Sequence, residues 1–341
     1  MKCILHVGPP KTGSTSIQTF LRQNKEILLA RGILALTDEQ IPRKLPYFFM
    51  KNDKLTPWAR RRQLDQPKRM EALRKETDSY IRKQIRKYKP DTLVLSSEGL
   101  SRLPTDEMAS MRDYLRGFAS ETEILIYLRR SDFRILSAYK NRIRNKHFTG
   151  GIIPKYRGRY DEGSTIEELG KCFGPDNITP VISKDSHPDR DGADGHIEAL
   201  LKVLFRDTDI TPGDFILPER RNIAWDYRAV YFMREFNRVA EKHPKFESYR
   251  LPMARLLQEH FSGGEKLKIK KSVAEAIVAN YQSGYEAIRQ QYFPQQESLF
   301  HTDFSMYSED TSAQTFGAEE AVHVSMVLLE SFLNDSKDKQ K

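Results

Sequence analysis

Apolar runs of strand length alternate with helical patterns through the first half of the chain. Lys2–Val7 and residues 92–95 and 124–128 are short apolar runs, and each is followed by a stretch with helical spacing. This alternation is typical of βα units around a parallel sheet. The pattern therefore predicts an α/β fold with a central parallel sheet, flanked by helices and extended by one more strand at Ile178–Ile182. The helices expected after the first three strands cover residues 14–30, about 105–118 and about 131–146.

Other segments follow different patterns. Residues 37–66 contain three prolines and show no clear period, so a long loop or lid is expected there. Pro67–Tyr88 has apolar residues on one helical stripe and most of its basic residues off that stripe. After Pro218 the pattern is wholly helical, most clearly over residues 265–292. A helical region therefore follows the predicted sheet.

These patterns predict one domain over residues 1–333. Its α/β core is expected to cover residues 1–215, and a mostly helical extension residues 216–333. Residues 334–341 are polar and are expected to form a flexible tail. A chain of 341 residues is long enough for a substantial core, and 38% hydrophobic and 30% charged residues are typical of a globular protein.

Cysteines and apolar stretches bear on the compartment of the protein. The only cysteines, Cys3 and Cys172, provide neither a disulfide framework nor a metal-ligand cluster, which favours a reducing compartment. No stretch approaches the roughly 18 consecutive apolar residues of a membrane-spanning helix. The apolar run at the N-terminus is too short for the core of a signal peptide. We therefore expect a cytoplasmic protein without a transmembrane segment.

Positive charge is concentrated in two segments. The net charge is +9, and residues 51–90 alone hold 14 Lys/Arg against 5 Asp/Glu. Residues 126–160 hold 10 against 1. Such clusters suggest anionic partners, although a basic, solvated helix face is an equally good interpretation of residues 67–89.

The turn after the first strand carries the most informative motif. Its sequence is Gly8-Pro9-Pro10-Lys11-Thr12-Gly13-Ser14-Thr15-Ser16, between an expected strand and an expected helix. Such a turn directs backbone N–H groups and a helix N-terminus at one point, which suits a phosphate. Gly8 and Gly13 have the spacing of a nucleotide-triphosphatase loop, yet Ser14 stands where that motif requires lysine, and the lysine is at position 11.

The segment from Pro10 to Ser16 resembles the 5′-phosphosulfate loop of the sulfotransferase family, usually P-K-[TS]-G-[ST]-[TS]. The resemblance implies a P-loop-like three-layer fold. It also implies a donor, 3′-phosphoadenosine-5′-phosphosulfate, which leaves adenosine 3′,5′-bisphosphate as the product. Lys11, Thr12, Gly13, Ser14, Thr15 and Ser16 would bind this nucleotide. The alternative is a lysine in an ordinary turn between a strand and a helix.

A second segment resembles the element with which sulfotransferases bind the 3′-phosphate. Arg129 ends a predicted strand, and Arg134, Ser137 and Tyr139 follow at the family's spacing. The resemblance implies that Arg129 and Ser137 contact the 3′-phosphate, and an arginine suits phosphate because its fork makes charge-assisted contacts. Arg130-Ser131 replaces the family's usual Asp-Pro, which leaves open which arginine acts. A solvated strand end is the alternative.

A third, weaker resemblance lies downstream. Residues 173–178 and 217–222 are similar to bacterial members of the family, in which an arginine–asparagine loop closes over the nucleotide. Arg221 and Asn222 would form that loop, although Ala224 stands where a serine is expected. The resemblance spans about residues 2–225, and its strong motifs lie in the first 140.

Transfer of a sulfuryl group requires alignment of donor and acceptor, stabilisation of the leaving phosphate and a base for the acceptor hydroxyl. Lys11 is the candidate for stabilising the leaving group. Glu98 is the candidate base, because it follows the strand at 92–95 and related carbohydrate sulfotransferases place a catalytic glutamate there. His147 is the alternative base, and a surface carboxylate is the alternative interpretation of Glu98.

The sequence therefore indicates a sulfotransferase that acts on a hydroxyl or amine, with an anionic glycan or glycolipid as the expected acceptor. Neither a metal nor a nucleic acid is expected as a partner. The basic helix 67–89 and the loop 140–159 are the candidate acceptor-binding segments. Two other classes stay open, namely a P-loop kinase that uses ATP and magnesium, and a non-catalytic binder of polyanions.

Overall fold

The structure is a computed structural model. It describes residues 1–37, 40–51, 55, 57–145, 147–152, 161–183, 194–206, 209–219 and 224–338. The chain forms two compact units, each built from three segments. The first unit comprises Met1–Arg130, Arg157–Glu219 and Tyr281–His301, and the second comprises Ser131–Tyr156, Arg220–Asn280 and Thr302–Lys341. The predicted single domain over residues 1–333 stays a prediction.

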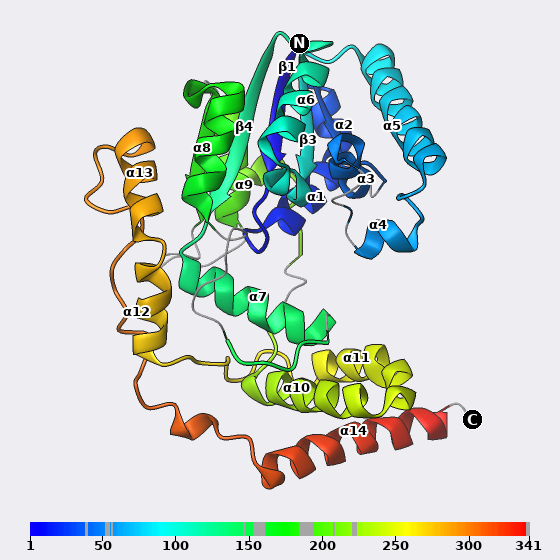
Figure 1. The fold of residues 1–341 in the computed structure, drawn as a ribbon, viewed down its shortest axis with the longest axis vertical. Coiled ribbons are helices and arrows are strands. Elements are labelled where there is room, and N and C mark those ends of the chain that lie inside the picture. Colours follow the sequence, from blue (N-terminus) through cyan, green and yellow to red (C-terminus); the bar gives the residue numbers. More distant parts are fainter. Residues whose placement is uncertain are drawn as a thin grey trace. The chain divides into compact units, whose positions relative to one another are not determined.

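A five-stranded, all-parallel sheet forms the centre of the first unit (Figure 1). The strand order is β2-β3-β1-β4-β5, so β1 lies between β3 and β4. Both neighbours of β1 run parallel to it, and their carboxyl ends meet at one edge of the sheet. The strands are β1 Lys2–Val7, β2 Ile33–Leu36, β3 Thr92–Ser97, β4 Glu121–Leu128 and β5 Ile178–Ile182.

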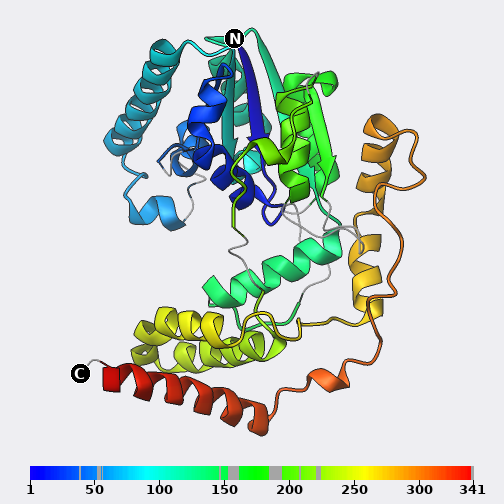
Figure 2. The same cartoon turned by 180° about the vertical axis from the view of Figure 1, so that it is seen from behind.

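Helices cover both faces of this sheet. Alternate strand residues, such as Ile4, Val94 and Leu125, pack in one core cluster with Phe20 and Leu200 from the helices α1 and α9. Figure 1 shows α6 and α8 in front of the sheet, and Figure 2 shows α1, α2 and α9 on the opposite face. The helices of this unit are α1 Ser14–Gln23, α2 Lys25–Leu29, α3 Gln40–Phe49, α4 Pro57–Arg61, α5 Pro67–Tyr88, α6 Thr105–Arg116, α8 Glu162–Phe173, α9 Asp194–Leu204 and α13 Gln282–Tyr292.

Among the described residues of the second unit, the regular elements are all helices. Its helices are α7 Ser131–Asn145, α10 Tyr227–Lys242, α11 Arg250–His260, α12 Lys271–Ala279 and α14 Ala318–Asp338. Ile143 of α7, Met233 of α10 and Leu257 of α11 share one core cluster with Val324 and Leu328 of α14. These apolar residues supply the burial that stabilises the unit.

The prediction of an α/β fold with a parallel sheet, helices on both faces and a helical C-terminal region is confirmed. The prediction of a loop over residues 37–66 is wrong, because α3 and α4 form there. Of the three prolines that suggested the loop, Pro42 falls in the first turn of α3 and Pro57 begins α4, whereas Pro46 lies inside α3. Proline costs little at positions 42 and 57, where the backbone N–H has no partner within the helix.

Two helices predicted as single elements are broken. The helix expected over 14–30 divides at Asn24, whose buried side chain donates to the carbonyls of Phe20 and Ile216 and accepts from the Ile216 N–H. The helix expected over 265–292 becomes α12 and α13, because the chain passes at Asn280 from the second unit to the first. At the C-terminus, α14 continues to Asp338, into the segment expected to form a tail.

Candidate functional site

The carboxyl ends of β1 and β3 bring Lys11 and Glu98 to the same edge of the sheet. Val7 of β1 pairs with Ser97 of β3, so Gly8 and Glu98 leave the sheet side by side. Ser101, in the 3₁₀ turn Glu98–Arg102, binds across this junction: its Oγ lies 3.2 Å from the carbonyl oxygen of Gly8 and 3.0 Å from that of Glu98. The hydroxyl therefore links the turn from Gly8 to Gly13, called the phosphate turn below, to the segment that carries Glu98.

The turn from Gly8 to Gly13 has an unusual backbone. Lys11 and Gly13 both lie in the left-handed region, with φ of 72° and 88°. Glycine adopts this conformation freely, whereas lysine adopts it at a cost. Inside the turn, Thr12 Oγ1 donates to the carbonyl oxygen of Pro9 at 2.7 Å. Strain of this kind is characteristic of sites where the backbone is held for a ligand.

The two glycines of the turn leave no room for a side chain. A Cβ at Gly8 would lie 2.1 Å from Ser14 Oγ, and a Cβ at Gly13 would lie 2.7 Å from the ring of His196. Ser14 is buried, and its Oγ has no hydrogen-bond partner among the described residues. No side chain caps the N-terminus of α1, which follows directly. Unsatisfied backbone N–H groups and an unpaired hydroxyl at one point fit a phosphate group.

The environment of Glu98 changes the acidity of its carboxyl group. The side chain is half-buried at the end of β3. Burial raises the pKa of the carboxyl, and the positive charges of Lys11 and Arg102 offset part of this rise. A raised pKa brings a carboxylate closer to the pH at which a general base works best.

The two arginines that end β4 have different environments. Arg129 Nη1 donates to the carbonyl oxygen of Lys11 at 2.9 Å, which puts its guanidinium group beside the phosphate turn. Arg130 is fully buried, and its Nη1 contacts His301 through the ring Nδ1 at 3.2 Å and the carbonyl oxygen at 3.0 Å. Of the two, Arg129 is therefore the one that the fold brings to the turn.

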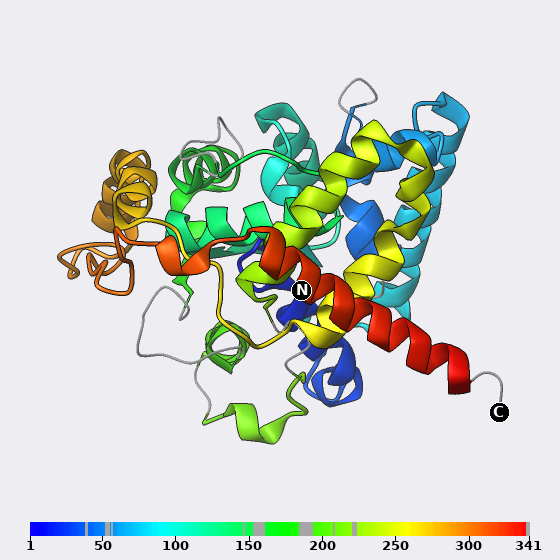
Figure 3. The same cartoon turned by 90° about the horizontal axis from the view of Figure 1, so that it is seen from below.

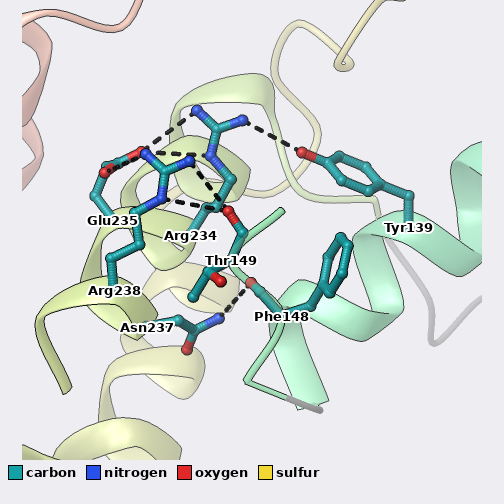
Figure 4. Close-up of polar contacts among 7 residues, drawn as sticks. All are labelled: Tyr139, Phe148, Thr149, Arg234, Glu235, Asn237 and Arg238. Carbon is teal, nitrogen blue, oxygen red and sulfur yellow. Dashed lines mark hydrogen bonds and ion pairs between the residues drawn. The ribbon is translucent and has the colours of Figure 1, made fainter. Parts of the chain in front are cut away.

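The remaining residues of the second motif belong to the second unit. Ser137 is half-buried on α7, and Arg134 and Tyr139 on the same helix are buried. The Tyr139 hydroxyl accepts from Arg234 Nη1 at 3.4 Å (Figure 4). His147, the alternative base, is exposed, and its Nδ1 lies 3.1 Å from a carboxylate oxygen of Glu247. The assignment of Ser137 to a 3′-phosphate stays a prediction.

Several basic residues near α7 have structural partners within the second unit. Arg142 stacks on Phe148, with 3.7 Å between the guanidinium carbon and the ring centroid. Arg144 lies over Trp225 and donates to Gln258 at 2.7 Å. Figure 4 shows the segment after α7 held on α10, where Arg238 donates to the carbonyl oxygen of Thr149 and Asn237 to that of Phe148. Several basic side chains of this region are therefore held in contacts within the unit.

Some predicted site residues lie outside the part of the chain that the structure describes. These are Arg221 and Asn222 of the expected closing loop, and Lys146, Lys155, Arg157 and Arg159 of the basic loop. Among the described residues, no three His, Cys, Asp or Glu side chains cluster as metal ligands. None of the described helices is both long and apolar enough to span a membrane.

Sequence reasoning missed three residues that contact or influence the site. Ser101 bridges Gly8 and Glu98, Arg102 lowers the pKa of Glu98, and the His196 ring packs on Gly13. The signal for Ser101 and Arg102 was available, because a turn that follows a candidate base puts its next residues nearby. His196 comes from α9, far along the chain, and its position could be known only from the fold.

Comparisons with known proteins add little to this description. No protein-family model and no curated protein matches the chain. A structural comparison finds a sulfotransferase from Alicyclobacillus acidocaldarius with 16% sequence identity and a TM-score of 0.41, covering 75% of this chain and 95% of that chain. A TM-score below 0.5 does not establish a shared fold, so conclusions about this chain rest on its own residues.

Proposed function

We propose that the protein is a sulfotransferase that uses 3′-phosphoadenosine-5′-phosphosulfate. The observation that carries this proposal is the position of Lys11 inside a strained phosphate turn, at the sheet edge that also carries Glu98. A triphosphatase needs its lysine at the position of Ser14, after the second glycine. Lysine inside the turn matches the 5′-phosphosulfate loop instead.

Glu98, Lys11 and the N-terminus of α1 each have a role in the proposed reaction. The nucleotide supplies an activated sulfuryl group on a good leaving group. Glu98 accepts the proton of the acceptor hydroxyl. The oxygen of that hydroxyl forms the new bond to sulfur. As the old S–O bond breaks, the electron pair stays on the phosphate, and Lys11 and the N-terminus of α1 stabilise that charge.

The acceptor is proposed to be an anionic glycan or glycolipid. Helix α5 supports this class, because Met70, Leu73, Thr77 and Ile81 form its buried stripe and many of its basic residues are exposed. The basic residues near α7 support it less, since Arg142 and Arg144 have structural partners. Exposed charges that bind an acceptor are screened over about 10 Å at 0.1 M salt.

The experiment is a transfer assay with 35S-labelled donor and three acceptors: a sulfated glycan, a neutral glycan and a small phenol. We expect label on the sulfated glycan, with an apparent KM that rises steeply between low and physiological salt. The Lys11→Ala variant serves as the control and should transfer almost none. If no acceptor is labelled while ATP with magnesium supports phosphoryl transfer, the protein is a kinase and the proposal is wrong.

A further inference from the structure

A buried histidine, His6, lies next to the phosphate turn and has no role in the reaction proposed above. It follows Ile4 by two residues on β1, so its ring faces the same side of the sheet, where α1 and α9 pack side by side (Figure 3). The ring is fully buried and meets the ring of Tyr127 edge to face, with 5.5 Å between the centroids. A ring buried this deeply requires hydrogen-bond partners for both of its nitrogens.

Only one of the two ring nitrogens of His6 has a partner among the described residues. Nδ1 lies 2.7 Å from Ser96 Oγ, on the neighbouring strand β3. Nε2 is buried and has no hydrogen-bond partner in this part of the chain. A Cβ at Gly8, the first residue of the phosphate turn, would lie 3.5 Å from Nε2. The nitrogen without a partner is therefore the one that borders the turn.

Ser14 Oγ borders the same space beside Gly8. The Cβ position at Gly8 lies even closer to this oxygen than to His6 Nε2. Ser14 is the first residue of α1, it is buried, and its Oγ likewise has no hydrogen-bond partner among the described residues. Two buried polar atoms that border one small space are costly unless they bind each other or a ligand.

We propose that His6 is a positioning residue for the 5′-phosphate of the donor and acts through the hydroxyl of Ser14. In the complex with nucleotide, Ser96 Oγ–H donates to His6 Nδ1, His6 Nε2–H donates to Ser14 Oγ, and Ser14 Oγ–H donates to a phosphate oxygen. No covalent bond changes and no proton is transferred. The role of His6 rests on the proposed function, which brings a phosphate to this turn.

The direction of these hydrogen bonds follows from the charge of the ligand. An ionised phosphate oxygen only accepts, so the Ser14 hydroxyl has to direct its hydrogen at the phosphate and needs a donor for its own lone pair. Burial, together with the neighbouring His196, lowers the pKa of His6 to about 3, so near pH 7 the ring is neutral and carries one hydrogen. Because Ser96 donates to Nδ1, that hydrogen is on Nε2. Hydrogen bonds in such a series strengthen one another.

Two substitutions at position 6 separate the roles of the two nitrogens. His6→Gln keeps an N–H donor near the position of Nε2, whereas His6→Asn keeps a polar group near the position of Nδ1 and ends short of Ser14. In calorimetry with adenosine 3′,5′-bisphosphate, His6→Asn should weaken binding about three- to tenfold, and His6→Gln should recover most of that loss. A histidine that served only to bind Ser96 would give the reverse order. That order, or parental affinity in His6→Asn, overturns the proposal.

A double-mutant cycle with Ser14→Ala tests whether His6 acts through this hydroxyl. Ser14→Ala alone should weaken binding at least about tenfold, because it removes a hydrogen bond to a charged group. In the Ser14→Ala background, His6→Asn should change the affinity less than about twofold, since the two contacts act in series. Additive losses would mean that His6 acts by another path, and the proposal would be wrong. Near-UV circular dichroism checks that each variant is folded.

Imidazole 15N NMR of the intact chain tests the proposal without any substitution. The ring of His6, assigned through its connection to the backbone, should carry its hydrogen on Nε2 from pH 6 to pH 8, and this N–H signal should shift when the bisphosphate binds. A hydrogen on Nδ1, or a ring that becomes positively charged on binding, contradicts the proposal. Failure of the proposed function gives a different result, because the parent would then bind ATP in place of the bisphosphate. The same order of variants measured with ATP would still support the role of His6.

Discussion

The carboxyl group of Glu98 experiences two opposing influences. Burial raises its pKa, and the charges of Lys11 and Arg102 lower it, with burial the larger effect. In the folded protein the ionised form is therefore less favourable than in the unfolded chain, so the contribution of Glu98 to stability is lost as pH rises through its raised pKa. The same shift makes the carboxylate a stronger base. In the proposed reaction, the protein thus gives up some stability for a more basic carboxylate.

Replacing Glu98 by glutamine separates its effect on stability from its effect on catalysis. The variant Glu98→Gln should lower kcat by about 10²–10⁴-fold, because the base is lost, while nucleotide affinity changes little. The acid limb of the parent's kcat–pH profile should lie above the usual carboxyl range and disappear in the variant. Thermal melts should show a higher Tm for the variant near pH 7.5, and this gain should vanish near pH 4.

Glu121→Gln is the matched control for this experiment. Glu121 is exposed at the start of β4, at the opposite end of the sheet from Glu98. Its replacement should leave both kcat and the pH profile unchanged. Near-parental turnover of Glu98→Gln would exclude Glu98 as the base, and His147→Gln would then be the next variant to assay.

At the scale of elements, the buried strands were the easiest to predict. Residues of β1, β3 and β4 form continuous apolar runs because parallel strands are buried on both faces. The short strand β2 was not predicted, since its four residues continue an apolar stretch that also fits a helix. The breaks at Asn24 and Asn280 depend on tertiary contacts or on passage between units, which local periodicity does not report.

The contact between α8 and α13 gives a prediction at this scale. Gly163 and Gly284 lie so close that a Cβ on Gly163 would be 2.6 Å from the Gly284 Cα. Gly163→Ala should therefore separate these helices and lower the free energy of unfolding by about 1–3 kcal/mol, measured by urea denaturation. Gly151→Ala is the control, since no atom lies within 4 Å of its added Cβ. Equal midpoints for both variants would contradict the close packing of α8 and α13.

At the scale of the whole molecule, positive charge serves more than one purpose. Arg74 of α5 donates to the carbonyl oxygens of Phe48 and Met50, and Arg82 forms an ion pair with Asp78. Arg144 in the other unit packs on Trp225. Sequence alone could locate the basic segments but could not separate cations that bind within the chain from those free to attract an anion. Side-chain partners depend on the fold.

The candidate site could be predicted where its residues directly follow a predicted strand. The phosphate turn and Glu98 follow from strand ends, because neighbouring parallel strands bring their carboxyl ends to one edge. The contact of Arg129 with Lys11 and that of His196 with Gly13 join residues more than 100 positions apart, and no pattern in the sequence reports them. These contacts depend on how the strands and helices of the first unit pack together.

The donor-binding site is tested most directly by isothermal titration calorimetry with adenosine 3′,5′-bisphosphate and ADP, in EDTA and then in magnesium. The proposed function predicts that the bisphosphate binds at least about tenfold more tightly, a difference of about 1.4 kcal/mol, without magnesium. Ser137→Ala should narrow this difference while ADP affinity is retained. Equal affinities for the two nucleotides, or binding that needs magnesium, would contradict the assignment of this site to a sulfotransferase.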